Sequence, residues 1–428
     1  MKYQPISADF YIENQQNLIA QLADNSLVIM QSAPVFPRNG DQFFHYRQDS
    51  DFFYLTGIDQ ENCMLIIWKG SQKTETKILL FIQKADKNQE IWYGRKLSLY
   101  DASKLSGIET VKYIDEYKDW VCNLAPKSKN LYVSKPKNHP FELDAFNYNR
   151  LSNLHCRNVL DSLRIRDLQE LIEAQRLIKS DFEIQQMNKA VSITKQAYLA
   201  VLNSLKPNQM EYEVEAQITA EFLRNGASGH AYEPIIAGGV NACILHYTDN
   251  DKVLKNGDLL LMDFGAEYGN YAADCSRTIP VNGTFSPRQR TLYQAVLDVY
   301  KRLIPLFVPG NTIEAINKMS GKWLEEKMLE LKLLSIDEVK NGTEESPAYK
   351  KYFMHGTSHF LGLDVHDVGN KQTVFQKGMV LTCEPGIYIE EENIGIRIET
   401  NIIVDNQPID LMADFPVEID EIEAAMMR

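Results

Sequence analysis

Five side chains that can bind metal ions lie in order along the second half of this sequence, and four of them are carboxylates. They are Asp263, Asp274, His359, Glu384 and Glu399. Their surroundings are typical of buried β-structure, where an unpaired carboxylate is costly and normally neutralises or finds a cation. Two divalent cations would balance these charges. The pattern therefore predicts a metal centre that activates water for hydrolysis.

The two aspartates flank a turn signal. The sequence Tyr268-Gly-Asn-Tyr271 lies between two strand-like arms and predicts a β-hairpin with a two-residue loop. Asp263 and Asp274 would then share one face of adjacent strands, directly opposite each other or one step diagonal. Like charges this close repel, and a cation between them removes the repulsion. Alone, the pair could also be one exposed and one buried aspartate with local hydrogen bonds.

Three of the eight histidines, His355, His359 and His366, lie in one short segment that contains glycine and is mostly apolar. A single histidine is usually a packed or surface residue, so the clustering is what favours a site. Histidine can bind a metal, carry a proton or donate a hydrogen bond to a substrate oxygen. We therefore expect this segment to line the same site as the carboxylates.

The last two carboxylates also lie in strand-like segments. Glu384 precedes Pro-Gly at the end of a strand, whereas Arg397 and Glu399 are two residues apart and share a strand face. Arg397 could hold a carboxylate through two hydrogen bonds. A plain surface salt bridge is the alternative.

The elements that must position these residues fall into two groups. The first part of the chain alternates short apolar runs with helical stretches, which predicts an α/β domain with a mostly parallel or mixed sheet. Its expected strands are 26–30, 63–68, 77–82 and 130–134, and its expected helices are 11–23 and 114–124.

The pattern changes near residue 163, and we place the domain boundary near residue 170. Expected helices are 167–206, 211–225, 287–304 and 312–334, with a break at 179–183 where Ser180 or Asp181 caps the second helix. Expected strands are 234–247, 258–280, 379–389 and 394–404. Residues 335–352 are polar and predict a surface loop.

Composition excludes some partners. The net charge of −13 argues against binding to nucleic acid, which needs clustered Lys and Arg, and against anionic membranes. The N-terminal residues carry charges and amides where a signal peptide needs an apolar run. Six scattered cysteines without such a signal predict free thiols in a reducing cytoplasm. Cys275 and Cys383 adjoin two expected ligands and should face away from the metals.

Together these segments resemble the pita-bread metallopeptidases, most closely the Xaa-Pro aminopeptidases (aminopeptidase P). The most specific segment is His355-Gly-Thr-Ser-His-Phe-Leu-Gly-Leu-Asp-Val-His-Asp-Val-Gly369. Residues 38–57 resemble part of the N-terminal domain of the same family, so the resemblance covers nearly the whole chain. It implies an aminopeptidase P-type α/β domain over 1–170 and an α+β pita-bread catalytic domain over 171–428.

The resemblance also implies a role for each site residue. Asp263, Asp274, His359, Glu384 and Glu399 would hold two metal ions, with Asp274 and Glu399 bridging them. Such oxygen-rich ligands suit Mn²⁺ best, and Co²⁺ or Zn²⁺ could substitute.

Other residues would act on the substrate. Glu384 would shuttle protons, and His246 and His366 would steady the carbonyl oxygen or the tetrahedral intermediate. His355 would hold the residue after the cleaved bond, and Arg397 would orient the bridging carboxylates. The positions that line the proline pocket match Tyr232, Leu363 and Tyr388.

The implied activity is removal of the N-terminal residue from peptides whose second residue is proline. Proline lacks an amide N–H and restricts the residue before it, which calls for a dedicated enzyme. Two alternatives stay open: a prolidase that cleaves only Xaa-Pro dipeptides, and a non-catalytic pita-bread binding protein. Glu384 and Glu399 are only 15 positions apart, so no long loop is expected over the site there. Some relatives carry a longer insertion, so the preferred peptide length stays open.

The expected partners are short peptides and a second copy, as a homodimer or homotetramer.

Overall fold

The computed structural model describes residues 3–84, 86–133 and 154–427. The chain divides into two compact units, Pro5–Arg176 and Leu177–Arg428, and Tyr3 and Gln4 join the second unit. Within the described residues, every helix is too short or too polar to cross a membrane.

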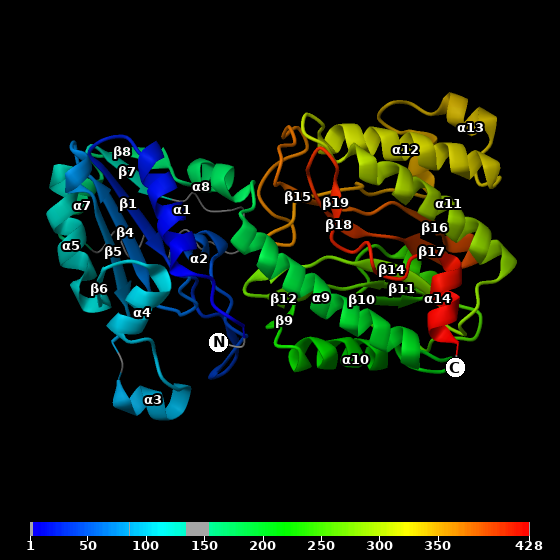
Figure 1. Cartoon of the computed structure of the whole chain (residues 1–428), viewed down its shortest axis with the longest axis horizontal. Coiled ribbons are helices and arrows are strands. Elements are labelled where there is room, and N and C mark those ends of the chain that lie inside the picture. Colours follow the sequence, from blue (N-terminus) through cyan, green and yellow to red (C-terminus); the bar gives the residue numbers. More distant parts are fainter. Residues whose placement is uncertain (1–2, 85, 134–153, 428) are drawn as a thin grey trace. The chain divides into compact units, whose positions relative to one another are not determined.

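The first unit is built on a six-stranded mixed sheet with the order β6-β5-β4-β1-β7-β8 (Figure 1). β1 pairs antiparallel with β4 and parallel with β7, and the four strands expected from sequence are confirmed. The edge strands β6 and β8 were not expected, because their residues are only partly buried and include charged side chains. The strands are β1 (Ser26–Gln31), β4 (Met64–Lys69), β5 (Lys77–Ile82), β6 (Thr110–Tyr113), β7 (Asn130–Val133) and β8 (Arg164–Asp167).

Helices and a small hairpin complete this unit. The helices are α1 (Ala8–Gln21), α2 (Ser50–Thr56), α3 (Lys87–Tyr93), α4 (Leu99–Ser106), α5 (Tyr117–Leu124), α7 (Arg157–Leu160) and α8 (Gln169–Arg176), and the hairpin is β2 (Pro37–Asn39) with β3 (Gln42–Phe43). A core cluster packs α5 and the segment around α7 against one face of the sheet, including Leu27, Ile66, Phe81 and Val121.

The prediction of free thiols is wrong for two of the six cysteines. Cys122 on α5 and Cys156 beside α7 are joined by a disulfide, with their Cα atoms 5.3 Å apart. They are 34 residues apart in sequence, and only the packing of the segments that carry them brings them together. Cys63, Cys243, Cys275 and Cys383 are free. Cys275 and Cys383 lie in the hydrophobic core of the second unit.

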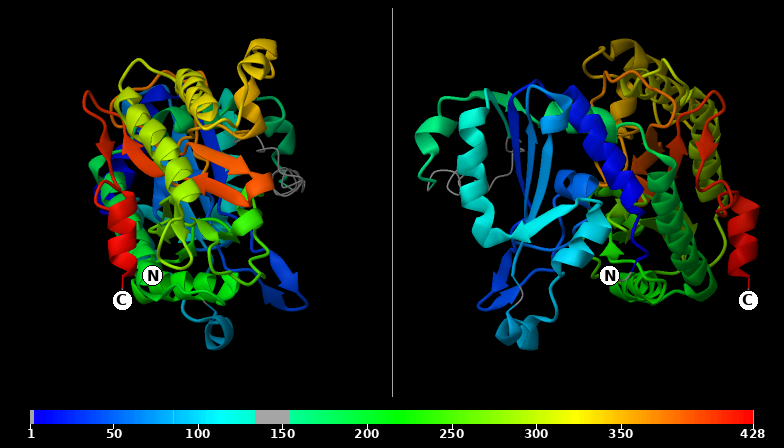
Figure 2. Two further views of the ribbon diagram at one scale, coloured as in Figure 1. Left: turned by 90° about the vertical axis from the view of Figure 1, so that its right-hand side faces the viewer. Right: turned by 60° about the vertical axis from the view of Figure 1, so that its left-hand side comes forward.

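The second unit packs short β-ladders against long helices, among them α9 to α12 (Figure 2). α9 contacts β12, α10 contacts β10 and α11 contacts β17. The helices are α9 (Asp181–Ser204), α10 (Glu211–Arg224), α11 (Pro287–Leu303), α12 (Ile313–Glu330), α13 (Ile336–Asn341) and α14 (Ile419–Met426). The first strands are β9 (Gly229–His230), β10 (Ile235–Gly238), β11 (Leu259–Asp263), β12 (Ala266–Tyr268), β13 (Tyr271–Ala272) and β14 (Ser276–Pro280). The later strands are β15 (Val380–Cys383), β16 (Gly386–Ile389), β17 (Ile394–Arg397), β18 (Thr400–Ile403) and β19 (Ile409–Asp410).

Capping signals place the helix starts correctly. Ser180 and Glu183 form a capping box at the start of α9, with the Ser180 backbone N–H donating to Glu183 Oε2 at 2.8 Å. Ser286 and Gln289 do the same for α11, whose first residue is Pro287. Such boxes satisfy backbone N–H groups that a helix start leaves without partners.

Three expectations about this unit need correction. Residues 335–352 are not a plain loop, because they contain α13 and a 3₁₀ turn at Ala348–Lys351. The expected strand 234–247 is β10 followed by a 3₁₀ turn, η4 (Gly239–Cys243), so His246 lies in a loop. The segments 379–389 and 394–404, each expected to be a strand, are each broken into two strands, and the expected hairpin within 258–280 is made of four short strands. Those breaks fall beside the acidic residues of the site.

Candidate metal centre

The hairpin predicted around the two aspartates is confirmed. Gly269 and Asn270 both have positive φ angles, 59° and 65°, and Tyr268 pairs with Tyr271 across this turn. On the flanking strands, Asp263 stands opposite Ser276, so Asp274 is one step diagonal from Asp263 on the same face. The two carboxylates thus come to the same place by strand register alone.

The hydroxyl of Tyr232 lies between these two carboxylates. It is 2.6 Å from Oδ1 of Asp263 and 2.6 Å from Oδ1 of Asp274. A hydroxyl carries one hydrogen and can donate to only one of them. The second oxygen therefore needs a proton or a cation beside it, which is the first sign that the carboxylates are arranged for a metal.

Three more ligand candidates close around Asp274. Nε2 of His359 is 3.3 Å from Oδ2 of Asp274 and 3.7 Å from Oε1 of Glu384. Ligand atoms of Asp274, His359 and Glu399 all lie within 4.8 Å of one another. Of the five predicted ligands, these three form the tight group, and Glu384 adjoins it through His359.

Asp263 joins the group through Asp274 and the shared Tyr232.

The acidic residues occupy positions where the β-ladders stop. Asp263 ends β11, Glu384 separates β15 from β16, and Glu399 separates β17 from β18. A residue at the end of a strand can turn its side chain and backbone away from the regular ladder. The broken strands therefore let several segments aim carboxylates at one point.

Arg397 is buried, with 4% of its surface exposed, so the alternative of a surface salt bridge is wrong. Its Nη2 donates to Oδ2 of Asp263 at 2.6 Å, and its Nε donates to the Ser276 hydroxyl at 2.7 Å. That hydroxyl in turn donates to Oε2 of Glu399 at 2.7 Å. Arg397 thus contacts Asp263 directly and reaches Glu399 through Ser276.

Burial and neighbouring charges shift the pKa values of several residues in this group. Burial raises the pKa of Glu399 well above its usual value, and the neighbouring Asp274 and Glu384 add to the shift. Burial also raises the pKa of Asp263, against the charge of Arg397, and raises that of Glu384 to about 7. Burial favours neutral His359, but its hydrogen bond with Asp274 and the charge of Glu384 outweigh this and raise its pKa to about 9.

These residues fit divalent cations. Four carboxylates share one small region with Arg397, and burial raises the pKa of three of them, Asp263, Glu384 and Glu399, because it disfavours their charged forms. The donor set is oxygen-rich with one imidazole, which hard or borderline divalent ions accept.

The remaining histidines surround the carboxylates. Nε2 of His355 is 2.7 Å from the hydroxyl of Tyr388, and its Nδ1 is 3.7 Å from Oε2 of Glu384. The rings of His359 and His366 meet edge to face, with centroids 4.4 Å apart. His246 is exposed, and its charge helps to lower the pKa of His366, after burial and His359. The structure therefore brings all four histidines to one neighbourhood.

The residues expected to line a proline pocket have varied surroundings. The hydroxyl of Tyr388 accepts from Nη1 of Arg397 at 2.9 Å, so Tyr388 and Tyr232 both reach the carboxylate group. Leu363 is buried, and the preceding Gly362 accepts a hydrogen bond from the Ala272 backbone N–H on β13 at 2.9 Å.

The sequence analysis did not predict two residues that hold the proposed ligands in place. Ser276 links Arg397 to Glu399, as described above. Asn401 holds the backbone of Asp274 through two hydrogen bonds, one to its carbonyl at 2.6 Å and one from its N–H at 3.2 Å. Each lies two positions after a predicted ligand, Asp274 and Glu399 respectively, so strand alternation was a signal that could have found both.

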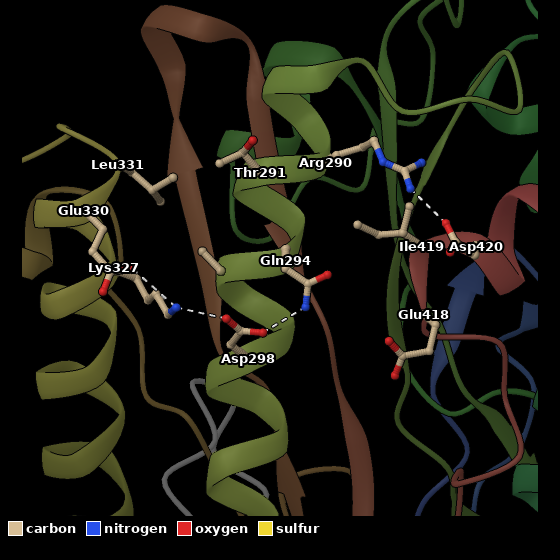
Figure 3. Close-up of a pocket in the computed structure, with 11 residues that line it drawn as sticks. Arg290, Thr291, Gln294, Asp298, Lys327, Glu330, Leu331, Glu418, Ile419 and Asp420 are labelled. Carbon is tan, nitrogen blue, oxygen red and sulfur yellow. Dashed lines mark hydrogen bonds and ion pairs between the residues drawn. The ribbon is translucent and has the colours of Figure 1, made fainter.

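A second hollow of about 570 Å³ lies outside this site, between α11, α12 and the start of α14 (Figure 3). Its charged side chains are mostly paired with one another. Arg290 bonds Asp420 at 2.8 Å, and Lys327 bonds Asp298 at 2.9 Å. We assign it no ligand.

Comparison with known proteins agrees with this geometry. Residues 185–406 match the metallopeptidase family M24, and residues 11–132 match the aminopeptidase P N-terminal domain. A Xaa-Pro aminopeptidase of Haemophilus influenzae is 36% identical, over 97% of this chain and 96% of its own. Proline aminopeptidase P II from Yersinia pestis superposes with a TM-score of 0.89 at 34% identity, covering 98% of this chain and 99% of its own. Zinc-substituted Escherichia coli aminopeptidase P in complex with product also gives 0.89, at 32% identity and 99% coverage of both chains.

The site is that of a metal-dependent hydrolase. The chain belongs to metallopeptidase family M24, and it combines an aminopeptidase P-type N-terminal domain with a pita-bread catalytic domain. The resemblance and the fold class predicted from the sequence are confirmed.

The raised pKa of Glu399 predicts how stability depends on pH in the metal-free protein. The folded state binds more protons than the unfolded state once the pH exceeds the unfolded value of 4.5, so stability falls as the pH rises toward the folded pKa. Glu399→Gln removes this loss. In chelator, its melting temperature relative to wild type should therefore increase between about pH 5 and about pH 8. The exposed Glu213→Gln is the control and should show no such trend.

In saturating Mn²⁺, wild type should instead melt at a higher temperature than Glu399→Gln, since wild type gains stability by binding the ion and the variant has lost a ligand. A metal-free Glu399→Gln variant that melts below wild type by the same margin at every pH would contradict this account of the site.

Proposed function

We propose that this protein is a dinuclear metallo-aminopeptidase that releases the N-terminal residue from peptides with proline in the second position. The observation that carries the proposal is the convergence of Asp274, His359 and Glu399, with Asp263 and Glu384 beside them. It stands in a chain that is similar over nearly its full length to Xaa-Pro aminopeptidases. The partners we propose are short peptides, with neither nucleic acid nor membrane.

Two divalent ions would be held by Asp263, Asp274, His359, Glu384 and Glu399, with Asp274 and Glu399 bridging. Manganese is the ion we propose, and cobalt or zinc could replace it. The zinc-substituted Escherichia coli relative supports a site that accepts more than one divalent ion. Bound there, such ions supply Lewis acidity and a water of lowered pKa.

The side chains of the protein then have distinct tasks. Glu384, 3.7 Å from both His355 and His359, would accept a proton from the attacking water and pass it to the leaving nitrogen. His246 and His366 would donate hydrogen bonds to the carbonyl oxygen as negative charge develops on it.

Substrate placement falls to the surrounding residues. His355 would hold the residue after the cleaved bond, and Arg397 would keep the carboxylates in place through Asp263 and Ser276. The rings of Tyr232 and Tyr388, together with Leu363, would form the proline pocket. This leaves the hydroxyls of both tyrosines tied to the polar network.

A prolidase and a non-catalytic binding protein are the alternatives. The Xaa-Pro aminopeptidases of Haemophilus influenzae and Escherichia coli are similar to nearly the whole chain, which favours a substrate longer than a dipeptide. A binding protein has no need of a complete set of ligands, and all five are present here.

The proposal predicts the outcome of a small substrate panel. Protein loaded with Mn²⁺ should release glycine from Gly-Pro-Ala much faster than from Gly-Pro, and should not cleave the control Gly-Ala-Ala at a comparable rate. A chelator should abolish all turnover, and added Mn²⁺ should restore it. Preferential cleavage of Gly-Pro would favour prolidase, and loss of the requirement for proline would refute the specificity proposed here.

The roles given to the two histidines predict a separation of metal binding from catalysis. His246→Ala and His366→Ala should each lower kcat by roughly 100-fold or more, the usual cost of losing one donor to a developing oxyanion. Bound manganese, measured by mass spectrometry, should stay at the wild-type level. If manganese were lost in step with activity, these histidines would be ligands and the assigned roles would be wrong.

An exposed apolar cluster on α3 supports self-association through the N-terminal domain. Ile91, Trp92 and Tyr93 are 78%, 82% and 74% exposed, which is unusual for adjacent large apolar residues. We propose that a second copy covers them in a closed dimer or tetramer. Trp92→Asp should lower the mass measured by light scattering, whereas Ile336→Asp, a substitution at an exposed residue of the other unit, should not. An unchanged mass for Trp92→Asp would refute this interface.

We place the protein in the cytoplasm and keep the domain limits 1–170 and 171–428. The argument from free thiols now applies to four of the six cysteines only. Cell fractionation, with alkylation to measure the oxidation state of Cys122 and Cys156, tests the location.

A further inference from the structure

One buried carboxylate holds both ends of the loop that carries His246. Glu211 is the first residue of α10, and none of its surface is exposed. Its Oε1 accepts hydrogen bonds from the Gly238 backbone N–H at 2.8 Å and from Nδ2 of Asn241 at 3.0 Å. These donors lie where the chain leaves β10 and enters η4.

The other oxygen of Glu211 holds the far end of the loop. Oε2 accepts from the Tyr247 hydroxyl at 2.8 Å and from the Lys252 backbone N–H at 2.9 Å. The Glu211 backbone N–H donates to the Lys252 carbonyl at 2.9 Å. All four groups facing the carboxylate can donate, which suits a side chain that only accepts. Tyr247 is the immediate neighbour of His246.

The loop depends on these anchors, because its own backbone is irregular. Gly239 has a positive φ of 57°, and Asn250 has one of 46°. Ala242 lies against β17: a Cβ at Gly395 would come within 2.2 Å of its carbonyl oxygen. The loop therefore touches the strand that ends at Arg397, while the side chain of His246 itself is exposed. What fixes His246 is the loop backbone, and what fixes both ends of that backbone is Glu211.

We infer that Glu211 is a positioning residue for the proposed reaction, and that it acts on the substrate carbonyl only through His246. This inference rests on the proposed function, and in particular on the role given to His246. The carboxylate touches neither the expected ligands nor the substrate. Its contribution is to hold the imidazole at the distance and angle at which it can donate to the developing oxyanion.

Glu211→Gln keeps the shape of the side chain but replaces one accepting oxygen with an NH₂ group. In either orientation that group would face a backbone N–H, of Gly238 or of Lys252, which cannot accept a hydrogen bond from it. A displacement of His246 by about 1 Å should cost on the order of 100-fold in rate. We therefore expect Glu211→Gln to lower kcat by about 10- to 100-fold, with KM changed by no more than about twofold and manganese content unchanged. Glu213→Gln alters the capping box of the same helix without touching the loop and should keep wild-type kcat.

A double-mutant cycle separates positioning from general damage to the fold. If Glu211 acts through His246, Glu211→Gln should change kcat by less than about threefold in a His246→Ala background, because coupled residues are not additive. An equal loss in both backgrounds would overturn the inference. Tyr247→Phe, which removes one donor and keeps the ring, gives a milder version of the same cycle if Glu211→Gln folds poorly.

Hydrogen exchange tests the anchoring without any turnover. Residues 239–252 should exchange faster in Glu211→Gln than in Glu213→Gln or wild type, whatever the enzyme cleaves. If wild type fails to cleave Gly-Pro-Ala but the loop loosens as expected, the proposed function fails and the anchoring survives. If wild type is active and exchange in the loop is unchanged, the inference about Glu211 fails and the proposed function stands.

Discussion

The mutual repulsion of carboxylates in a buried place is the constraint on which the rest of this structure depends. Asp263, Asp274, Glu384 and Glu399 lie together beside Arg397, and burial raises the pKa of three of them. Gathering them is unfavourable unless cations balance their charge. Tyr232 and Ser276 donate hydrogen bonds to these carboxylates, and Asn401 exchanges two with the Asp274 backbone, so the groups are oriented but not neutralised.

The fold meets this constraint by breaking its strands where the acids lie. β11, β15 and β17 each stop at or beside an acidic residue, so backbone ladders hold the segments while the side chains turn inward. The histidines come from less regular segments: His246 from the loop anchored by Glu211, and His355 and His366 from the glycine-containing stretch before β15. Asp263 ends a strand, and Asp274, Glu384 and Glu399 lie in short breaks between strands, whereas loops carry the four histidines of the site.

Much of this could be predicted because the decisive signals are local. Alternation along a strand and the Gly-Asn turn placed Asp263 and Asp274 on one face, opposite each other or one step diagonal, and capping residues placed the start of α9. Long-range packing was less accessible. The Cys122–Cys156 pair, the Ser276 link and the Glu211 anchor join residues between 27 and 123 positions apart, and no local pattern specifies them. The strand breaks beside Asp263 and Glu399 were not predicted, whereas the Pro-Gly after Glu384 did mark the end of its strand.

The most direct test of the central claim is the number of divalent ions that the carboxylate group binds. Metal-free protein titrated with Mn²⁺ in a calorimeter should bind two ions per chain, with proton release at neutral pH because Glu384, whose pKa is raised to about 7, is partly protonated before binding. Glu399→Ala should lose both ions, as expected of a ligand that bridges them. Binding of no ion by wild type, or of two ions by Glu399→Ala, would contradict the account.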